Sequence, residues 1–128
     1  MKKSIVTTIG VLFMVAALAT AWAVDTKKGE ASFKSPTFAG GNTGKSCWTC
    51  HENGNGLGED LFKGKEYTIM GMEKKTLADV VNVCIERPLG GKAIDTEGED
   101  MKNILAYMKE LVEKASKKKK KRQPIEGC

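Results

Sequence analysis

One short segment of the chain combines residue types that can bind a cofactor covalently. It reads Cys47-Trp48-Thr49-Cys50-His51 and fits the pattern C-x-x-C-H. This pattern is typical of c-type haem attachment, in which two thiols form thioethers to the vinyl groups of one haem. The histidine directly after the second cysteine is then placed beneath the iron as an axial ligand. The sequence therefore predicts one covalent haem c on Cys47 and Cys50, with His51 as the proximal iron ligand.

Two other kinds of site could use the same residues. One is a zinc site, with Cys47, Cys50, His51 and Cys84 as ligands. A histidine directly after a cysteine fits a tetrahedral metal cage poorly. The other is a thioredoxin-like redox pair, which would need a strand before the motif. The preceding residues 39–46 are instead rich in glycine. The residue pattern therefore favours haem over both alternatives.

The second axial position of the iron has several candidate ligands, because the only histidine is already used. Met70 and Met72 lie in a stretch that we expect to be a flexible loop, and Met101 opens a predicted helix. A methionine ligand is common in electron carriers, where it raises the potential. Cys84 lies on the apolar face of another predicted helix. From the residues alone it is an iron ligand, a small buried thiol or the partner of Cys128 in a disulfide.

Three helices are predicted around the motif. The first covers residues 26–34 and ends before a proline. The second covers residues 76–86, where apolar side chains recur at i, i+3, i+4 and i+7 behind an N-capping threonine. The third and longest covers residues 99–115, with an apolar stripe, an acidic start and a basic end. No strand is expected, so residues 24–115 are predicted to form one all-α domain.

The start of the chain has the features of an export signal. Residues 1–23 contain two lysines, an uncharged apolar run and the small-residue site Ala21-Trp22-Ala23. These features are typical of a cleaved signal peptide, and the alternative is an uncleaved membrane anchor. Either interpretation predicts that the domain lies outside the cytoplasm, in the periplasm.

The end of the chain carries most of its positive charge. Residues 24–113 hold 12 basic and 15 acidic residues, a net charge of −3, whereas residues 114–128 hold 7 basic and 1 acidic, a net charge of +6. Such a block of charge cannot bury itself, so residues 116–128 are predicted to be a basic flexible tail. The tail is either simply solvated or docks on an acidic partner or an anionic membrane surface. Export argues against a nucleic-acid partner.

Beyond the motif itself, the chain resembles a small class I cytochrome c. The resemblance covers nearly all of residues 26–114. It is carried by Gly29-Glu30 with Phe33, by Gly44-Lys45-Ser46 before the motif, and by Ala106-Tyr107-Met108 in the last helix. It implies short helices packed around one covalently bound haem. It also implies that the first and last helices cross, with Gly29 and Phe33 close to Tyr107.

Residues 76–108 are similar, more specifically, to haem domains of the thiosulfate dehydrogenase and SoxA type, which are bacterial sulfur-oxidation cytochromes. The similarity is carried by the run from Asn82-Val83-Cys84 to Ala93-Ile94 and by Asp100-Met101 with the residues up to Met108. It implies that Cys84 is the distal iron ligand. Those families commonly carry two haem motifs or a partner subunit, whereas this chain has one motif.

Two functions agree with these features. The first is a periplasmic monohaem cytochrome that carries single electrons between redox protein partners, a task that needs no catalytic base. The alternative is an enzyme, or a haem subunit of one, that oxidises thiosulfate or a related sulfur compound with the help of Cys84. Only Arg87, Lys92 and Lys45 offer positive charge for such an anion. We therefore expect the electron carrier.

Overall fold

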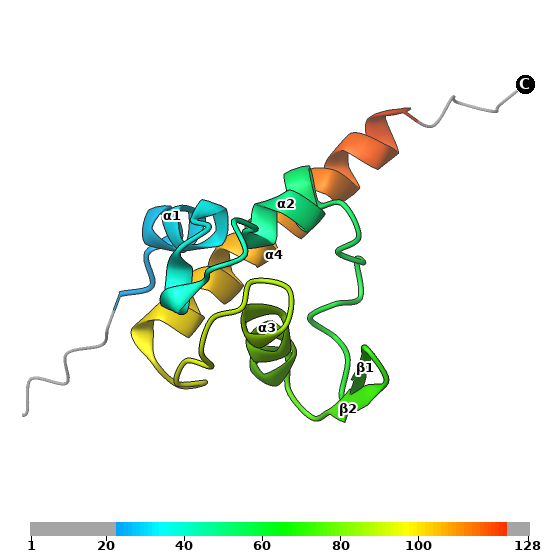
Figure 1. Ribbon diagram of the computed structural model, residues 1–128. Helices are drawn as coiled ribbons and strands as arrows, with labels where there is room; N and C mark the ends of the chain where they lie inside the picture. Colours follow the sequence, from blue (N-terminus) through cyan, green and yellow to red (C-terminus); the bar gives the residue numbers. More distant parts are fainter. Residues whose placement is uncertain (1–22, 123–128) are drawn as a thin grey trace, which may run out of the picture.

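The computed structural model describes residues 23–122, which form helices and one small β-hairpin (Figure 1). The elements are α1 (Thr26–Lys34), the 3₁₀ helix η1 (Phe38–Gly40), α2 (Cys47–His51), the 3₁₀ helix η2 (Glu52–Gly54), β1 (Tyr67–Ile69), β2 (Met72–Lys74), α3 (Leu77–Glu86) and α4 (Glu99–Arg122). The signal peptide predicted over residues 1–23 lies outside the described residues, except for Ala23. Between residues 23 and 122, no helix has both the length and the apolar character needed to cross a membrane.

The helices predicted over residues 26–34 and 76–86 are confirmed. The carboxylate of Asp25 caps α1 by accepting hydrogen bonds from two N–H groups of the first turn, at 2.9 and 3.2 Å. The hydroxyl oxygen of Thr76 caps α3 by accepting a hydrogen bond from the N–H of Asp79 at 3.1 Å. Such caps satisfy N–H groups that have no partner inside the helix, so both starts are fixed by local sequence.

The last helix begins at Glu99 as predicted but continues to Arg122, well past the predicted end at Ala115. Residues 116–122, which we predicted to begin a flexible tail, are helical, while residues 123–128 lie outside the described residues. Lysine and arginine have good intrinsic helix propensity, and cations are favourable near a helix C-terminus because of the helix dipole. These effects support a helix through the lysine run, although its charge is not buried.

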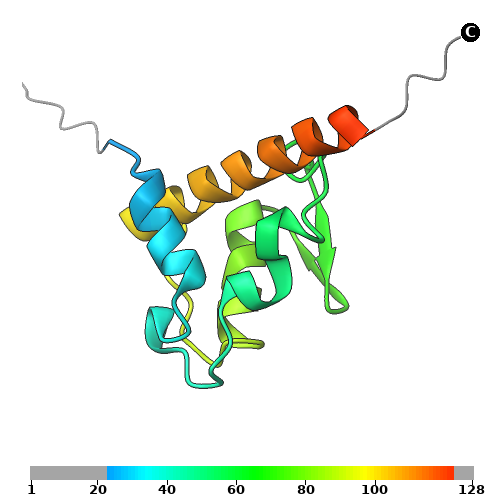
Figure 2. The ribbon, with the colours of Figure 1, turned by 90° about the horizontal axis from the view of Figure 1, so that it is seen from above.

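The first and last helices cross in close contact, as the resemblance implied (Figure 2). A Cβ atom added to Gly29 would overlap the backbone carbonyl of Asn103, so the two backbones touch at this point. The rings of Phe33 and Tyr107 pack edge to face beside it, with centroids 5.5 Å apart. The N–H of Asp25 also donates to the side-chain oxygen of Asn103 at 2.7 Å. This crossing holds the start of the domain on α4.

Strands β1 and β2 form an antiparallel hairpin, so the prediction of a strictly all-α domain is wrong. The turn consists of Met70 and Gly71, with φ angles of +50° and +75°. Positive φ at both central residues is the pattern of a type I′ turn, which usually takes Asn or Asp before Gly. Because a methionine occupies the first of these positions, the sequence gives only a weak indication of the turn.

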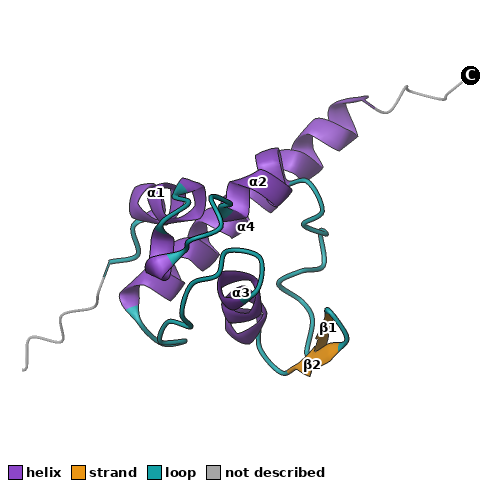
Figure 3. Ribbon diagram, in the orientation of Figure 1, coloured by secondary structure: helices purple, strands orange, loops and turns teal. Residues whose placement is uncertain are grey.

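Two stretches without regular structure link elements in the second half of the chain (Figure 3). One leads from η2 to β1 and the other from α3 to α4. The side chain of Asn82 on α3 fixes the second stretch, because it donates to the carbonyl of Ile94 and accepts from the N–H of Ile94, both at 2.9 Å. This paired hydrogen bond holds the connection against α3.

We predict that Gly29→Ala lowers the free energy of unfolding by about 1–3 kcal/mol, because the new methyl group would separate α1 from α4. Chemical denaturation of the purified protein measures this change. Gly58→Ala is the matched control, because a Cβ there meets nothing within 4 Å. It should leave stability unchanged or raise it by up to about 1 kcal/mol. Equal stability of both variants would contradict the backbone contact.

Candidate cofactor-binding site

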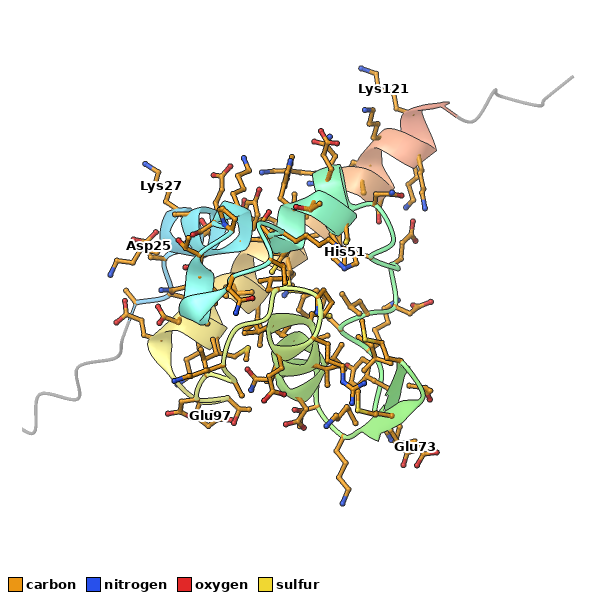
Figure 4. All side chains as sticks on the ribbon, in the orientation of Figure 1. Asp25, Lys27, His51, Glu73, Glu97 and Lys121 are labelled. Atoms are coloured by element: carbon orange, nitrogen blue, oxygen red, sulfur yellow. The ribbon has the colours of Figure 1, made fainter. Side chains whose placement is uncertain are left out.

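The three residues of the C-x-x-C-H motif lie on one face of the short helix α2. Positions i, i+3 and i+4 of a helix are neighbours on its surface, and Cys47, Cys50 and His51 have this spacing. Cys47 is buried, His51 is half-buried and Cys50 is exposed. Figure 4 shows that His51 points from α2 toward the interior, above α3. The helix thus presents two thiols and an imidazole to the same space.

The start of α2 is fixed by a local hydrogen-bond pair. The N–H of Ser46 donates to the hydroxyl oxygen of Thr49 at 3.0 Å, and the N–H of Thr49 donates to the carbonyl of Ser46 at 3.1 Å. Ser46 is buried, so its N–H would otherwise have no water to bind. Thr49, between the two cysteines, therefore contributes to the helix that positions them.

The motif faces a largely apolar cavity of about 600 Å³. This volume falls within the roughly 300–1,000 Å³ typical of cofactor and ligand pockets. Its walls come from α1, α2, α3, α4, the hairpin and the loop before the hairpin. Besides the motif residues, the apolar wall contains Phe33, Leu57, Leu61, Ile69, Leu77, Val80, Val81, Leu89, Ile104 and Met108. Every α-helix of the described region therefore contributes to the wall of this cavity.

His51 is held in one tautomer by a backbone hydrogen bond. Its Nδ1 atom lies 2.9 Å from the carbonyl oxygen of Asn55. Because a carbonyl oxygen can only accept, Nδ1 must carry the proton, which leaves the lone pair of Nε2 available to a metal. Hydrogen bonds of this kind orient metal-binding histidines. The ring also lies beside Gly56, where an added Cβ would be 3.5 Å from Nδ1.

The structure separates the candidate distal ligands into two groups. Cys84 and Met70 both line the cavity that contains the motif. Met101 does not line it and is completely buried in the core between the helices. Met72 lies in β2 and does not line it either. Met101 and Met72 are therefore not placed at the cavity, and their assignment as ligands stays a prediction.

Sequence reasoning missed one further sulfur atom at the cavity, that of Met108 on α4. Met108 is buried and shares the apolar stripe of α4 with Met101. The apolar stripe alone predicts that both side chains face inward, because the two residues are seven positions apart, close to two helical turns. Only the packing of the helices assigns Met108 to the cavity.

Burial favours the protonated form of two thiols at the cavity, those of Cys47 and Cys84. It raises the pKa of Cys47 to about 11, with a smaller contribution from the nearby Cys84. The pKa of Cys84 is also raised, chiefly by burial and then by the nearby Cys50. Cys47, Cys50 and Cys84 are not joined to one another by disulfides. The predicted pairing of Cys84 with Cys128 involves a residue outside the described range and stays a prediction.

The two alternative sites gain no support. In the part of the chain that the structure describes, no three His, Cys, Asp or Glu side chains are grouped so that they could hold a metal ion by themselves. No strand precedes the motif between residues 23 and 46, as a thioredoxin-like pair would require. A porphyrin brings its own equatorial nitrogens, so it needs only axial ligands and an apolar enclosure. The residues around the cavity fit that need.

No family model, curated protein or solved structure matches the chain.

We predict that Thr49→Val lowers the free energy of unfolding by about 1 kcal/mol, because the buried N–H of Ser46 loses its acceptor. Chemical denaturation of the purified protein measures the change. Thr49→Ser keeps the hydroxyl and is the control, with an effect well below that of Thr49→Val. If Thr49→Val and Thr49→Ser are equally stable, the bond to Ser46 does not stabilise α2.

Proposed function

We propose that this chain is an exported monohaem c-type cytochrome of class I that carries single electrons between redox partners in the periplasm. The observation that carries the proposal is the convergence of Cys47, Cys50 and His51 on one apolar cavity. The motif predicts thioether attachment, and the cavity offers the apolar enclosure that a porphyrin requires. When bound, the haem would supply an iron that alternates between the ferrous and ferric states.

In this proposal Cys47 and Cys50 hold the group covalently, and His51 supplies the axial nitrogen. The carbonyl of Asn55 accepts the proton of Nδ1, so the lone pair of the neutral imidazole is on Nε2 of His51. The side chains of Phe33, Ile104 and the other apolar lining residues exclude water from the centre. Apolar burial and axial ligation are the principal means by which a protein sets the potential of a haem iron.

We propose Cys84 as the distal ligand, in preference to Met70 and Met108. Cys84 lies in the last turn of α3, and its two neighbours in sequence, Val83 and Ile85, are both buried. Met70 lies at the tip of the hairpin turn and is 54% exposed, so its position is less constrained. A ligand on a rigid helix keeps its distance to the iron more closely than one on a turn.

The presence of Cys84 at the cavity also favours the second function, in thiosulfate or sulfur-compound oxidation. A cysteine there could bind the iron and take part in sulfur chemistry, as the resemblance of residues 76–108 implies. Among the basic side chains considered for an anion site, Arg87, Lys92 and Lys45 are all exposed and none lines the cavity. The cavity is thus short of positive charge for a bound sulfur oxyanion, so the electron carrier remains our first proposal.

We predict that His51→Ala abolishes the normal visible spectrum while haem remains attached to Cys47 and Cys50, because thioether formation and axial ligation use different atoms. Visible spectroscopy and mass spectrometry of the exported protein measure the two properties separately. Cys47→Ala with Cys50→Ala is the comparison variant and should lose the covalent haem mass. A wild-type protein without covalent haem, made in a host that matures cytochromes, would contradict the proposed function.

We predict that Cys84→Ser changes the visible spectrum and shifts the midpoint potential, because an oxygen ligand or an open position would replace a sulfur ligand. Redox titration followed by absorbance measures both. Met70→Leu and Met108→Leu are the controls and should leave the spectrum unchanged. An unchanged spectrum in Cys84→Ser would transfer the ligand assignment to a methionine. Reduction of the haem by thiosulfate, lost in Cys84→Ser, would favour the second function over electron transport.

A further inference from the structure

The helical end of α4 carries a block of positive charge that has no ion-pair partner among the described residues. Residues 117–121 are five consecutive exposed lysines. The ion pairs of the described residues include Lys114 with Glu110 at 3.2 Å, but none of them involves residues 117–121. This part of α4 also extends beyond the rest of the fold (Figure 1). The charge is therefore presented to other molecules on a helix of defined shape.

The shape of this helix end favours a protein surface over a lipid bilayer as its partner. Five successive helical residues are spread over more than one full turn, so the lysines at 117–121 point to all sides. A helix that lies in a membrane interface needs an apolar face opposite its basic face. Residues 117–121 have no such face. A helix with positive charge on all sides can instead bind an acidic protein surface, where complementary charge attracts and orients the two proteins.

A hollow lies beside the lysines, at the loop that supports His51. It has a volume of about 460 Å³ and is lined by residues 52–58 on one side and by Ala115, Lys118 and Lys119 on the other. The loop sits directly on α4, because a Cβ added to Gly54 would lie 3.1 Å from the carbonyl oxygen of Leu111. The packing of this loop on α4 therefore places it at a defined position relative to Lys118 and Lys119.

The wall between this hollow and the cofactor cavity is thin. Gly56 and Leu57 line both spaces. Gly56 has no side chain, and its backbone adjoins the ring of His51. A partner seated in the hollow would thus be separated from the ring of His51 by little more than a peptide backbone.

We propose that the hollow between Lys118, Lys119 and the loop 52–58 is the docking site for an acidic redox protein, and that electrons pass across Gly56 and Leu57. This inference rests on the proposed function. With a haem bound, the iron held by His51 would supply one electron and go from ferrous to ferric while an acceptor on the partner gains that electron, and no bond would be made or broken. The lysines supply attraction and orientation, and the loop supplies the short path.

The test uses the full exported chain, labelled with ¹⁵N, and poly-L-glutamate as the acidic probe. We expect amide shifts in the loop 52–58 and in residues 115–121 on titration. In the variant Lys118→Gln with Lys119→Gln, the dissociation constant should rise about tenfold at low salt, because the paired charge is removed. The control is Lys102→Gln with Lys109→Gln, two exposed lysines elsewhere on α4, and it should change the constant less than about twofold.

A second readout follows electron transfer to ferricyanide, which accepts one electron from the reduced protein. Poly-L-glutamate should slow this reaction in the wild type and lose that effect in the variant of Lys118 and Lys119. The difference should disappear near 1 M salt, where the screening length is about 3 Å.

Three outcomes would overturn the docking site. If both double variants raise the dissociation constant equally, the binding is general charge attraction. If amide shifts occur only in residues 115–121, the loop 52–58 is not part of the docking site. Binding to phosphatidylglycerol vesicles without any binding of poly-L-glutamate would make a membrane the partner. Whether the protein carries haem is measured independently of docking, by its mass and its visible absorbance. A colourless chain that still gives the expected shifts would contradict the proposed function and keep the docking surface.

Discussion

The backbone contact between α1 and α4 is the constraint on which the rest of the structure depends. Gly29 lets α1 lie directly on the carbonyl of Asn103, without a side chain between the helices. This close approach brings the ring of Phe33 from α1 to the same cavity as Ile104 and Met108 from α4. The α1 and α4 walls of the cavity therefore depend on the absence of a side chain at Gly29, and the remaining elements supply the other walls.

The parts of the fold that could be predicted are those controlled by neighbouring residues. The capping side chains of Asp25 and Thr76 fixed the starts of α1 and α3, because a cap acts within one helical turn. The hairpin was missed because its turn places Met70 at a positive φ, a conformation that the surrounding structure must impose. The end of α4 was misplaced because helix propensity and repulsion oppose each other along the lysine run, and their balance is not visible from residue types.

In the candidate site, too, local sequence predicts some features and only the tertiary fold determines others. The spacing of Cys47, Cys50 and His51 already implies one helical face, and the cavity lies on that face. The choice between Met101 and Met108 depends on how the helices pack around that cavity, which only the fold supplies. The role of Asn82 is likewise tertiary, since its partner Ile94 lies in the connection that follows α3. Periodicity thus identifies an inward face but not which of its members reaches the centre.

The hydrogen bond between His51 and Asn55 has a consequence for how this site tolerates change. Its acceptor is a peptide carbonyl, so the orientation of the imidazole depends on the backbone of the loop and not on a second side chain. The side chain at position 55 takes no part, and many residue types could replace it. The restriction falls instead on the backbone around it, because Asn53, Gly54 and Gly56 adopt φ angles of +54°, +80° and +71°.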